Sequence, residues 1–269
     1  MRTNTLNEIR AQGRMALNAW VSVGSGYLAE VLGHCGFDAV TVDLQHAPFG
    51  FDTAVHLLQA ISSSPAIPLA RSSSNQLAEI NKLLDAGAYG IICPLINSVD
   101  EAASLARACR YPPRGDRSFG PSRGLTYGGK DYASHADDEI MSLAMIETTT
   151  GLESVEKILE IEELSGVYIG PSDLGLAMGL GSSAWPHPAI VQATQHILQA
   201  ARQRGKYVGI FSGTNAMDAD LKAMDFDLIT PGNDIQQLRS GVQFRLDSLR
   251  DRSASSVDLS SQRTTLVKA

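Results

Sequence analysis

Eight short apolar runs, alternating with longer amphipathic segments, constrain the fold of this 269-residue chain more than any other feature. The runs lie at 16–21, 39–44, 67–71, 90–95, 143–147, 167–170, 207–211 and 227–230. Most are followed by a stretch whose apolar residues recur at the spacing of one buried helix face. Parallel strands need crossover helices and covered faces, so this pattern predicts a closed (β/α)8 TIM barrel. A doubly wound open sheet is the alternative, but its dinucleotide fingerprint is absent, because Gly24-Ser-Gly26 has no third glycine in place.

The predicted barrel occupies residues 1–250 as a single domain. Its 43% apolar content is ordinary for a protein with a full core. Residues 251–269 are rich in Ser, Thr and charge, which predicts a disordered tail. Residues 111–139 hold prolines, glycines and three arginines, and we expect a structureless lid or binding loop there. Its arginines, Arg114, Arg117 and Arg123, would either gather a second substrate carboxylate or only solvate the loop.

Composition excludes several classes of partner. The net charge of −7 argues against nucleic acid and anionic membranes, since both normally demand a basic face. No stretch approaches the roughly 20 apolar residues of a membrane helix, and the N-terminus lacks the apolar core of a signal peptide. Cys35, Cys93 and Cys109 have no metal-ligand spacing, which predicts reduced thiols in a cytoplasmic protein.

Two carboxylates follow successive predicted strands. Glu147 ends the run 143–147, and Asp173 comes shortly after the run 167–170. A salt bridge or a helix N-cap could explain either acid alone, but neither explains both at adjacent strand ends. Hard divalent cations take oxygen ligands and keep open positions for substrate oxygens. The pair therefore predicts a metal site for a divalent cation such as Mg²⁺, Mn²⁺ or Co²⁺.

Basic and imidazole residues end two earlier strands. His46 follows the second run, where nearby Asp43 could orient its imidazole as a base, although a lone histidine is more often a capping or core residue. Arg71 ends the third run and suits a keto or carboxylate oxygen, although a structural ion pair is the common use of such an arginine. Because loops after the strands build the active site of a βα barrel, we favour the functional interpretation of both.

Two further observations narrow the chemistry. The turn Gly170-Pro171-Ser172 leads into a short helical run, where backbone N–H groups can hold a small carboxylate, and 231–234 offers a less specific second cradle. A Schiff-base aldolase needs a lysine at a strand end. The lysines lie instead on predicted helices, before the seventh strand, in the long loop and in the tail, which leaves the metal-dependent route.

Six short motifs occur in order along the chain: Asp43-Leu-Gln-His46-Ala-Pro, Leu69-Ala-Arg71, Lys82-Leu-Leu-Asp85-Ala-Gly-Ala, Tyr111-Pro-Pro-Arg-Gly115-x-Arg117, Ile146-Glu147-Thr and Ile169-Gly-Pro-Ser-Asp173-Leu. Through these motifs the sequence, from about residue 5 to residue 250, resembles the class II pyruvate aldolases of the HpcH/HpaI family. The family includes 4-hydroxy-2-oxoheptanedioate aldolase and 2-keto-3-deoxy sugar-acid aldolases. The resemblance implies a (β/α)8 barrel whose last helix is exchanged between subunits, commonly in a homohexamer built from dimers.

The resemblance also implies roles for individual residues. Glu147 and Asp173 would be the metal ligands, and Arg71 would hold the keto oxygen and stabilise the enolate. His46, oriented by Asp43, would act as acid and base, and Asp85 would reach in from a neighbouring subunit. The backbone from Gly170 through Pro171 and Ser172 to Asp173 would hold the pyruvate carboxylate.

The sequence departs from the family pattern at Gln45, Ser118 and Met145, which concern recognition of the aldehyde rather than of pyruvate. The expected reaction is reversible cleavage of a 4-hydroxy-2-oxo acid to pyruvate and an aldehyde. Oxaloacetate decarboxylation or an enolate-forming synthase reaction would use the same core. More distant alternatives are a CoA-thioester lyase of the citrate lyase β or malyl-CoA type, and a non-catalytic binding barrel.

Overall fold

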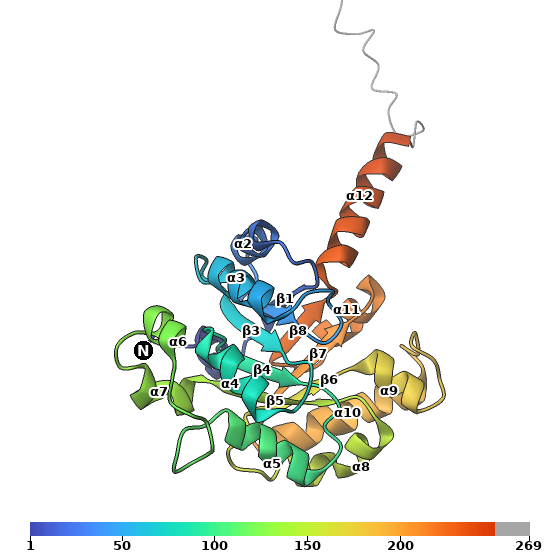
Figure 1. Ribbon diagram of the computed structural model, residues 1–269. Helices are drawn as coiled ribbons and strands as arrows, with labels where there is room; N and C mark the ends of the chain where they lie inside the picture. Colours follow the sequence, from blue (N-terminus) through green and yellow to red (C-terminus); the bar gives the residue numbers. More distant parts are fainter. Residues whose placement is uncertain (251–269) are drawn as a thin grey trace, which may run out of the picture. The chain divides into compact units, whose positions relative to one another are not determined.

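The computed structural model describes residues 1–250 and has a closed barrel of eight parallel strands in chain order (Figure 1). The strands are β1 (Ala16–Val21), β2 (Ala39–Asp43), β3 (Ile67–Arg71), β4 (Gly90–Cys93), β5 (Met141–Ile146), β6 (Gly166–Ile169), β7 (Tyr207–Ser212) and β8 (Leu228–Pro231). The barrel closes by pairing of β1 with β8. The predicted TIM barrel is therefore confirmed, and each predicted apolar run overlaps one strand.

Helices cover the outside of the barrel (Figure 1). They are α1 (Thr5–Ala11), α2 (Gly26–His34), α3 (Phe51–Ile61), α4 (Leu77–Asp85), α5 (Val99–Ala108), α6 (Ser122–Gly128), α7 (Tyr132–Glu139), α8 (Thr149–Ile158), α9 (Pro171–Ala177), α10 (Pro188–Gln203) and α11 (Asn215–Lys222). The i, i+3, i+4 pattern of α4 buries Ile80, Leu83 and Leu84, as its periodicity predicts. None of the described helices is long and apolar enough to cross a membrane.

The prediction of a structureless lid at residues 111–139 is wrong. The segment contains α6 and α7, and α6 packs on α4. Its arginines take partners within the fold: Arg114 pairs with Asp138 and Glu163, Arg117 with Asp85, and Arg123 donates to Ala86, Leu58 and Ser62. Arg117 is buried and Arg123 is partly buried, whereas Arg114 is exposed. The partners of these arginines within the fold order a segment whose glycines and prolines are typical of loops.

Residues Met1–Asp234 form one compact unit, and a second unit begins at Ile235. Helix α12 (Asp234–Arg250) has 17 residues, and all but the first of them belong to the second unit. The boundary of the predicted single domain at residue 250 stays a prediction. The predicted disordered tail, residues 251–269, lies outside the described residues.

A buried carboxylate connects three elements at the end of the barrel where the strands begin. Asp227, 3% exposed, accepts hydrogen bonds from Arg10 of α1 at 3.1 Å and from Arg202 of α10 at 2.8 Å. Its second oxygen accepts the backbone N–H of Val208 on β7 at 2.8 Å. Loss of the Asp227 carboxylate would leave Arg10 and Arg202 without this buried partner at the same time. We therefore expect Asp227 to contribute more to stability than a single surface ion pair does.

Replacement of Asp227 by Ala should therefore lower the free energy of unfolding by about 3–5 kcal/mol, measured by urea denaturation. The matched control is Asp225→Ala, which removes a carboxylate that is 84% exposed and lies 3.0 Å from the same Arg202. This control should change stability little, since exposed ion pairs contribute little. Equal effects of the two variants would contradict the assignment.

Candidate active site

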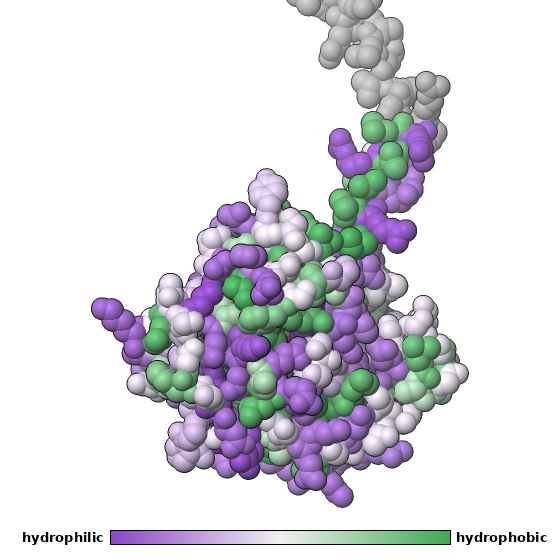
Figure 2. Space-filling view, in the orientation of Figure 1, coloured by the Kyte–Doolittle hydropathy of each residue, from purple (hydrophilic) through white to green (hydrophobic). Residues whose placement is uncertain are grey.

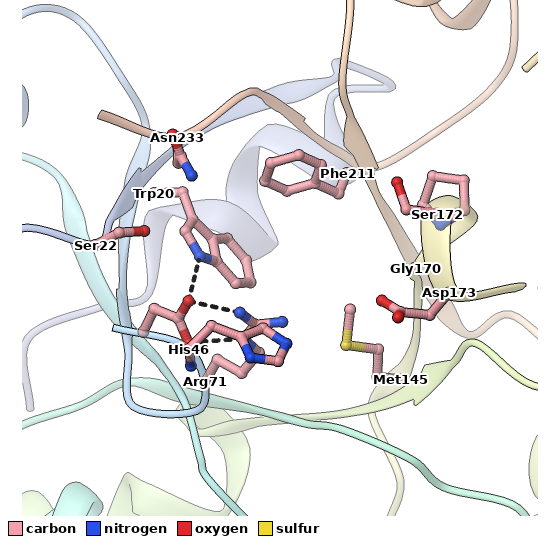
Figure 3. Close-up of a pocket in the computed structure, with 12 residues that line it drawn as sticks. Trp20, Ser22, His46, Arg71, Met145, Gly170, Ser172, Asp173, Phe211 and Asn233 are labelled. Atoms are coloured by element: carbon pink, nitrogen blue, oxygen red, sulfur yellow. Dashed lines mark hydrogen bonds and ion pairs between the residues drawn. The ribbon is translucent and has the colours of Figure 1, made fainter. Parts of the chain in front are cut away.

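A cavity of about 310 Å³ lies where the strands end (Figure 3). Its lining includes most of the residues that the strand-end argument singled out, namely Asp43, His46, Arg71, Gly170, Pro171, Ser172 and Asp173. The remaining lining residues are Trp20, Ser22, Met145, Phe211 and Asn233. The rule that functional side chains gather at the carboxyl ends of parallel strands therefore brings seven predicted residues together.

Arg71 and Asp43 form a buried bidentate ion pair on one side of the cavity. They occupy matching positions on β3 and β2, so parallel pairing places both side chains at the same level. Arg71 Nε donates to Asp43 Oδ1 at 2.9 Å and Nη2 donates to Oδ2 at 2.5 Å. The two residues are only 7% and 2% exposed. Two parallel bonds fix the orientation of the guanidinium plane as well as its charge.

Trp20 on β1 supports this ion pair from the side (Figure 3). Its indole Nε1 donates to Asp43 Oδ2 at 3.3 Å, and the Arg71 guanidinium carbon lies 4.8 Å from the centre of its ring. A cation over an indole face is attracted by the electron density of the ring. Burial by itself raises the pKa of Asp43, but the bonds and charge of Arg71, with help from Trp20, outweigh it and lower that pKa overall.

His46 lies in the turn after β2 and lines the cavity on the same side as Arg71 (Figure 3). Asp43 Oδ1 accepts the backbone N–H of Gln45 at 2.9 Å and that of His46 at 3.3 Å. The carboxylate therefore fixes the main chain of this turn. Both carboxylate oxygens face the Arg71 guanidinium, and Asp43 bonds the backbone of His46 rather than its ring. The orientation of the imidazole by Asp43 stays a prediction.

Asp173 lies across the cavity from Arg71, on the first turn of α9 (Figure 3). Glu147 follows β5 and is buried beside Gly170, with 3% of its surface exposed. Glu147 Oε1 accepts the backbone N–H of Leu95 at 2.7 Å. Leu95 adopts φ 55°, a left-handed conformation that costs energy for a leucine and aims its N–H at this carboxylate.

Gly170 packs closely against Glu147 and Met145 at the same place. A Cβ atom on Gly170 would lie 2.8 Å from Glu147 Oε2 and 2.9 Å from Met145 Cε. Such distances are shorter than real Cβ contacts, so only glycine fits without displacing the carboxylate. Burial raises the pKa of Glu147 to about 7, and the nearby charge of Asp173 adds to the increase while the Leu95 N–H opposes it.

Asp85 is not part of this cavity. It ends α4 and accepts a hydrogen bond from Arg117 Nη2 at 3.0 Å. The expectation that Asp85 reaches into the site of a neighbouring subunit stays a prediction. None of the arginines of segment 111–139 lines the cavity either, so the expected second carboxylate site is absent from the cavity lining of the described chain.

Sequence reasoning missed Trp20 and Phe211 as parts of the site. Both are aromatic residues in apolar strands, and such residues are indistinguishable from core residues until the barrel closes. A signal did exist for Trp20: it is the penultimate residue of β1, at the end of the strand where the functional residues of a barrel lie. Met145 was noted as a departure from the family pattern, and the structure places it in the wall of the cavity.

The chain is similar in sequence and in fold to proteins of one known family. The sequence profile of the HpcH/HpaI aldolase/citrate lyase family matches residues 17–240. A hydroxypyruvate/pyruvate aldolase of Rhizorhabdus wittichii is 38% identical over 242 residues, which are 88% of this chain and 96% of the relative. A 4-hydroxy-2-oxo-heptane-1,7-dioate aldolase of Klebsiella pneumoniae is 32% identical over 89% of this chain and 91% of the relative. A crystal structure of a family protein from Burkholderia cenocepacia has a TM-score of 0.86 and 29% identity, covering 92% of this chain and 100% of that one. The chain belongs to the HpcH/HpaI aldolase/citrate lyase family.

Proposed function

We propose that this protein is a divalent-metal-dependent aldolase that reversibly cleaves a 4-hydroxy-2-oxo acid into pyruvate and an aldehyde. The observation that carries the proposal is the placement of a fixed guanidinium, Arg71, across one cavity from the carboxylate of Asp173. Cleavage beside a carbonyl leaves an enolate, and such a site offers positive charge where the enolate oxygen develops. Membership of an aldolase family and relatives named as aldolases support the same chemistry.

The residues around Glu147 and Asp173 fit a divalent cation. Both donate carboxylate oxygens, which suit Mg²⁺ and Mn²⁺. The pKa of Glu147 is raised because burial, with the charge of Asp173, outweighs the hydrogen bond from Leu95 and the nearby charge of Arg71. A bound cation would favour the ionised form of this carboxyl group. When bound, a divalent cation acts as a Lewis acid on the keto and carboxylate oxygens of the substrate.

The other residues would then bind and orient the substrate and move its protons. Arg71 would donate to the keto oxygen, and Asp43 keeps the guanidinium in place before substrate arrives. His46 would accept the proton of the C4 hydroxyl as the C3–C4 bond breaks, and a proton added at C3 would complete pyruvate. Backbone N–H groups from Gly170 to Asp173 would hold the substrate carboxylate.

We also propose that α12 is exchanged between subunits of a homohexamer built from dimers. Leu238, Val242, Leu246 and Leu249 recur along this helix at spacings of four and three residues, which places them on one face. All four are among the exposed large apolar residues, and Figure 2 shows hydrophobic and hydrophilic surface side by side along the helix. In such an assembly Asp85 of one subunit would support His46 of another.

We propose a cytoplasmic location because the three cysteines are free. Cys35 is exposed, Cys93 and Cys109 are buried, and all three are free thiols. Free thiols persist where the compartment is reducing. Exposed Cys35 would be the first to oxidise elsewhere.

The function is tested by exchange of the pyruvate methyl protons in D₂O, followed by NMR, with added Mn²⁺ or Mg²⁺ and then with EDTA. Exchange reports enolate formation without knowledge of the aldehyde, and we expect it to depend on the metal. The variant Glu147→Gln should abolish both exchange and Mn²⁺ binding while leaving the circular dichroism spectrum unchanged. Exchange that survives EDTA, or a Gln variant that still binds Mn²⁺, would refute the assignment.

Stabilisation by metal should depend on pH. The pKa of Glu147 is raised from 4.5 to about 7 in the metal-free protein, so this group stabilises the fold below about pH 4.5 and loses that contribution as the pH rises through 7. Metal binding needs the ionised form and releases the proton. The increase in Tm on adding Mn²⁺ should therefore be larger at pH 8 than at pH 6. An increase independent of pH would exclude Glu147 as the titrating ligand.

Removal of the Arg71 guanidinium should act on catalysis rather than on binding. For Arg71→Ala we expect kcat to fall about 100- to 1000-fold, which is the usual effect of deleting one donor to a developing oxyanion. Arg71→Lys keeps the charge but not the bidentate geometry and should recover only part of the loss. If KM alone rose, the role of Arg71 at the enolate oxygen would be wrong.

The apolar face of α12 can be tested by light scattering coupled to gel filtration. The double variant Leu238→Glu, Leu249→Glu should reduce the molar mass of the assembly. Two charges would replace apolar side chains that the proposed helix exchange buries between subunits. Ser240→Glu adds a charge to the same helix at a residue outside the apolar face and should leave the mass unchanged. A monomeric wild-type protein would end the proposal of helix exchange.

A further inference from the structure

A chain of hydrogen-bonded polar residues crosses the barrel interior. Thr41 Oγ1 donates to Asn18 Oδ1 at 3.0 Å, and Asn18 Nδ2 donates to Thr230 Oγ1 at 2.8 Å. The hydroxyl of Tyr168 donates to the same Thr230 oxygen at 2.6 Å. All four residues have 0% exposure. We call them the interior polar chain; apolar side chains of similar size would fill this layer without the desolvation cost of polar groups.

The interior polar chain lies one layer beneath the active-site cavity. Residues two apart on a strand point to the same side of a sheet, so Thr41 lies below Asp43, and Asn18 below Trp20. The chain connects β2, β1, β8 and β6, and β6 is not a neighbour of β8 in the sheet. Its last link therefore crosses the interior of the barrel instead of following the wall.

Room for that link is provided by β7. A Cβ atom on Gly209 would lie 2.7 Å from Cδ2 of the Tyr168 ring. The ring therefore occupies the space that the side chain of any other residue at position 209 would fill. The tyrosine ring is thus held at two points, by the glycine surface under its edge and by the hydrogen bond of its hydroxyl. The substitution Tyr168→Phe would keep the packing against Gly209 and lose the hydrogen bond to Thr230.

The held ring packs against Trp20. The ring centres of Trp20 and Tyr168 are 5.8 Å apart, and Phe211 meets the indole edge-on at 5.7 Å. Between these two rings the indole has little freedom to tilt. The same indole donates to Asp43 and lies under the guanidinium of Arg71. A change in the tilt of Trp20 would therefore displace the ion pair.

We propose that Tyr168 is a positioning residue for the Asp43–Arg71 pair, acting through Trp20 and fixed by its hydrogen bond to Thr230. The proposal rests on the proposed role of Arg71 at the enolate oxygen. Tyr168 itself is absent from the lining of the cavity, so it acts on the reaction only through the residues above it. Tyr168 would affect the rate of the reaction through the position of the Arg71 guanidinium, because a small displacement of a fixed donor raises the energy of the transition state.

The test is Tyr168→Phe, assayed by metal-dependent exchange of the pyruvate methyl protons. We expect kcat for exchange to fall about tenfold with KM for pyruvate unchanged, since the ground-state contacts remain. Thr230→Val removes the acceptor of both Tyr168 and Asn18. The double variant Tyr168→Phe, Thr230→Val should therefore be no slower than Thr230→Val alone, because the hydrogen bond of Tyr168 is already lost in it. The matched control is Tyr207→Phe on β7, whose buried hydroxyl has no hydrogen-bond partner among the described residues. It should leave kcat unchanged.

A second readout separates this inference from the proposed function. In a Trp185→Phe background, Trp20 is the single tryptophan, and its fluorescence reports the indole directly. Tyr168→Phe should raise the acrylamide quenching constant of Trp20, whereas Tyr207→Phe should not. A wild-type protein without exchange would refute the proposed function and leave the quenching result to decide the inference. Wild-type kcat or unchanged quenching in Tyr168→Phe would overturn the inference.

Discussion

The buried pair of Arg71 and Asp43 is the interaction on which the rest of the active site depends. Each charge alone would be strongly unfavourable at 7% and 2% exposure, and removal of either partner would leave the other uncompensated. Matching register on β3 and β2 lets the two side chains meet without backbone distortion. The guanidinium is therefore fixed in position, so the proposed reaction would need no reorganisation as negative charge develops beside it.

The two sides of the cavity differ in how they treat a carboxyl group. On one side an arginine lowers the pKa of Asp43 despite its burial. On the other side burial dominates and raises the pKa of Glu147 to about 7. The first carboxylate is already neutralised by protein, whereas the second is suited to neutralisation by a cation from solution. Asp43 and Asp173 line the cavity, and Glu147 is buried beside Gly170 in its wall, so the three acidic residues differ in how their charge is compensated.

The barrel and the gathering of Asp43, His46, Arg71 and Asp173 were predictable because both follow from strand periodicity. Once eight parallel strands close, their carboxyl ends necessarily share one face. The segment 111–139 was not predictable from its glycines and prolines. Its order depends on ion pairs such as Arg114 with Glu163, which are 49 residues apart in the sequence. The proposed metal ligands and the role of Asp85 remain predictions, since they concern a cation and a neighbouring subunit.

The sequence by itself determined the alternation of strands and helices and the family, because apolar periodicity and short motifs are properties of neighbouring residues. Only the tertiary structure decided which partner each charged side chain takes. Asp43 faces Arg71, 28 residues away, and thereby binds the backbone rather than the ring of His46. It also decided that Trp20 and Tyr168 support this pair from β1 and β6. Such contacts depend on register and on closure of the barrel, which no local pattern of residues contains.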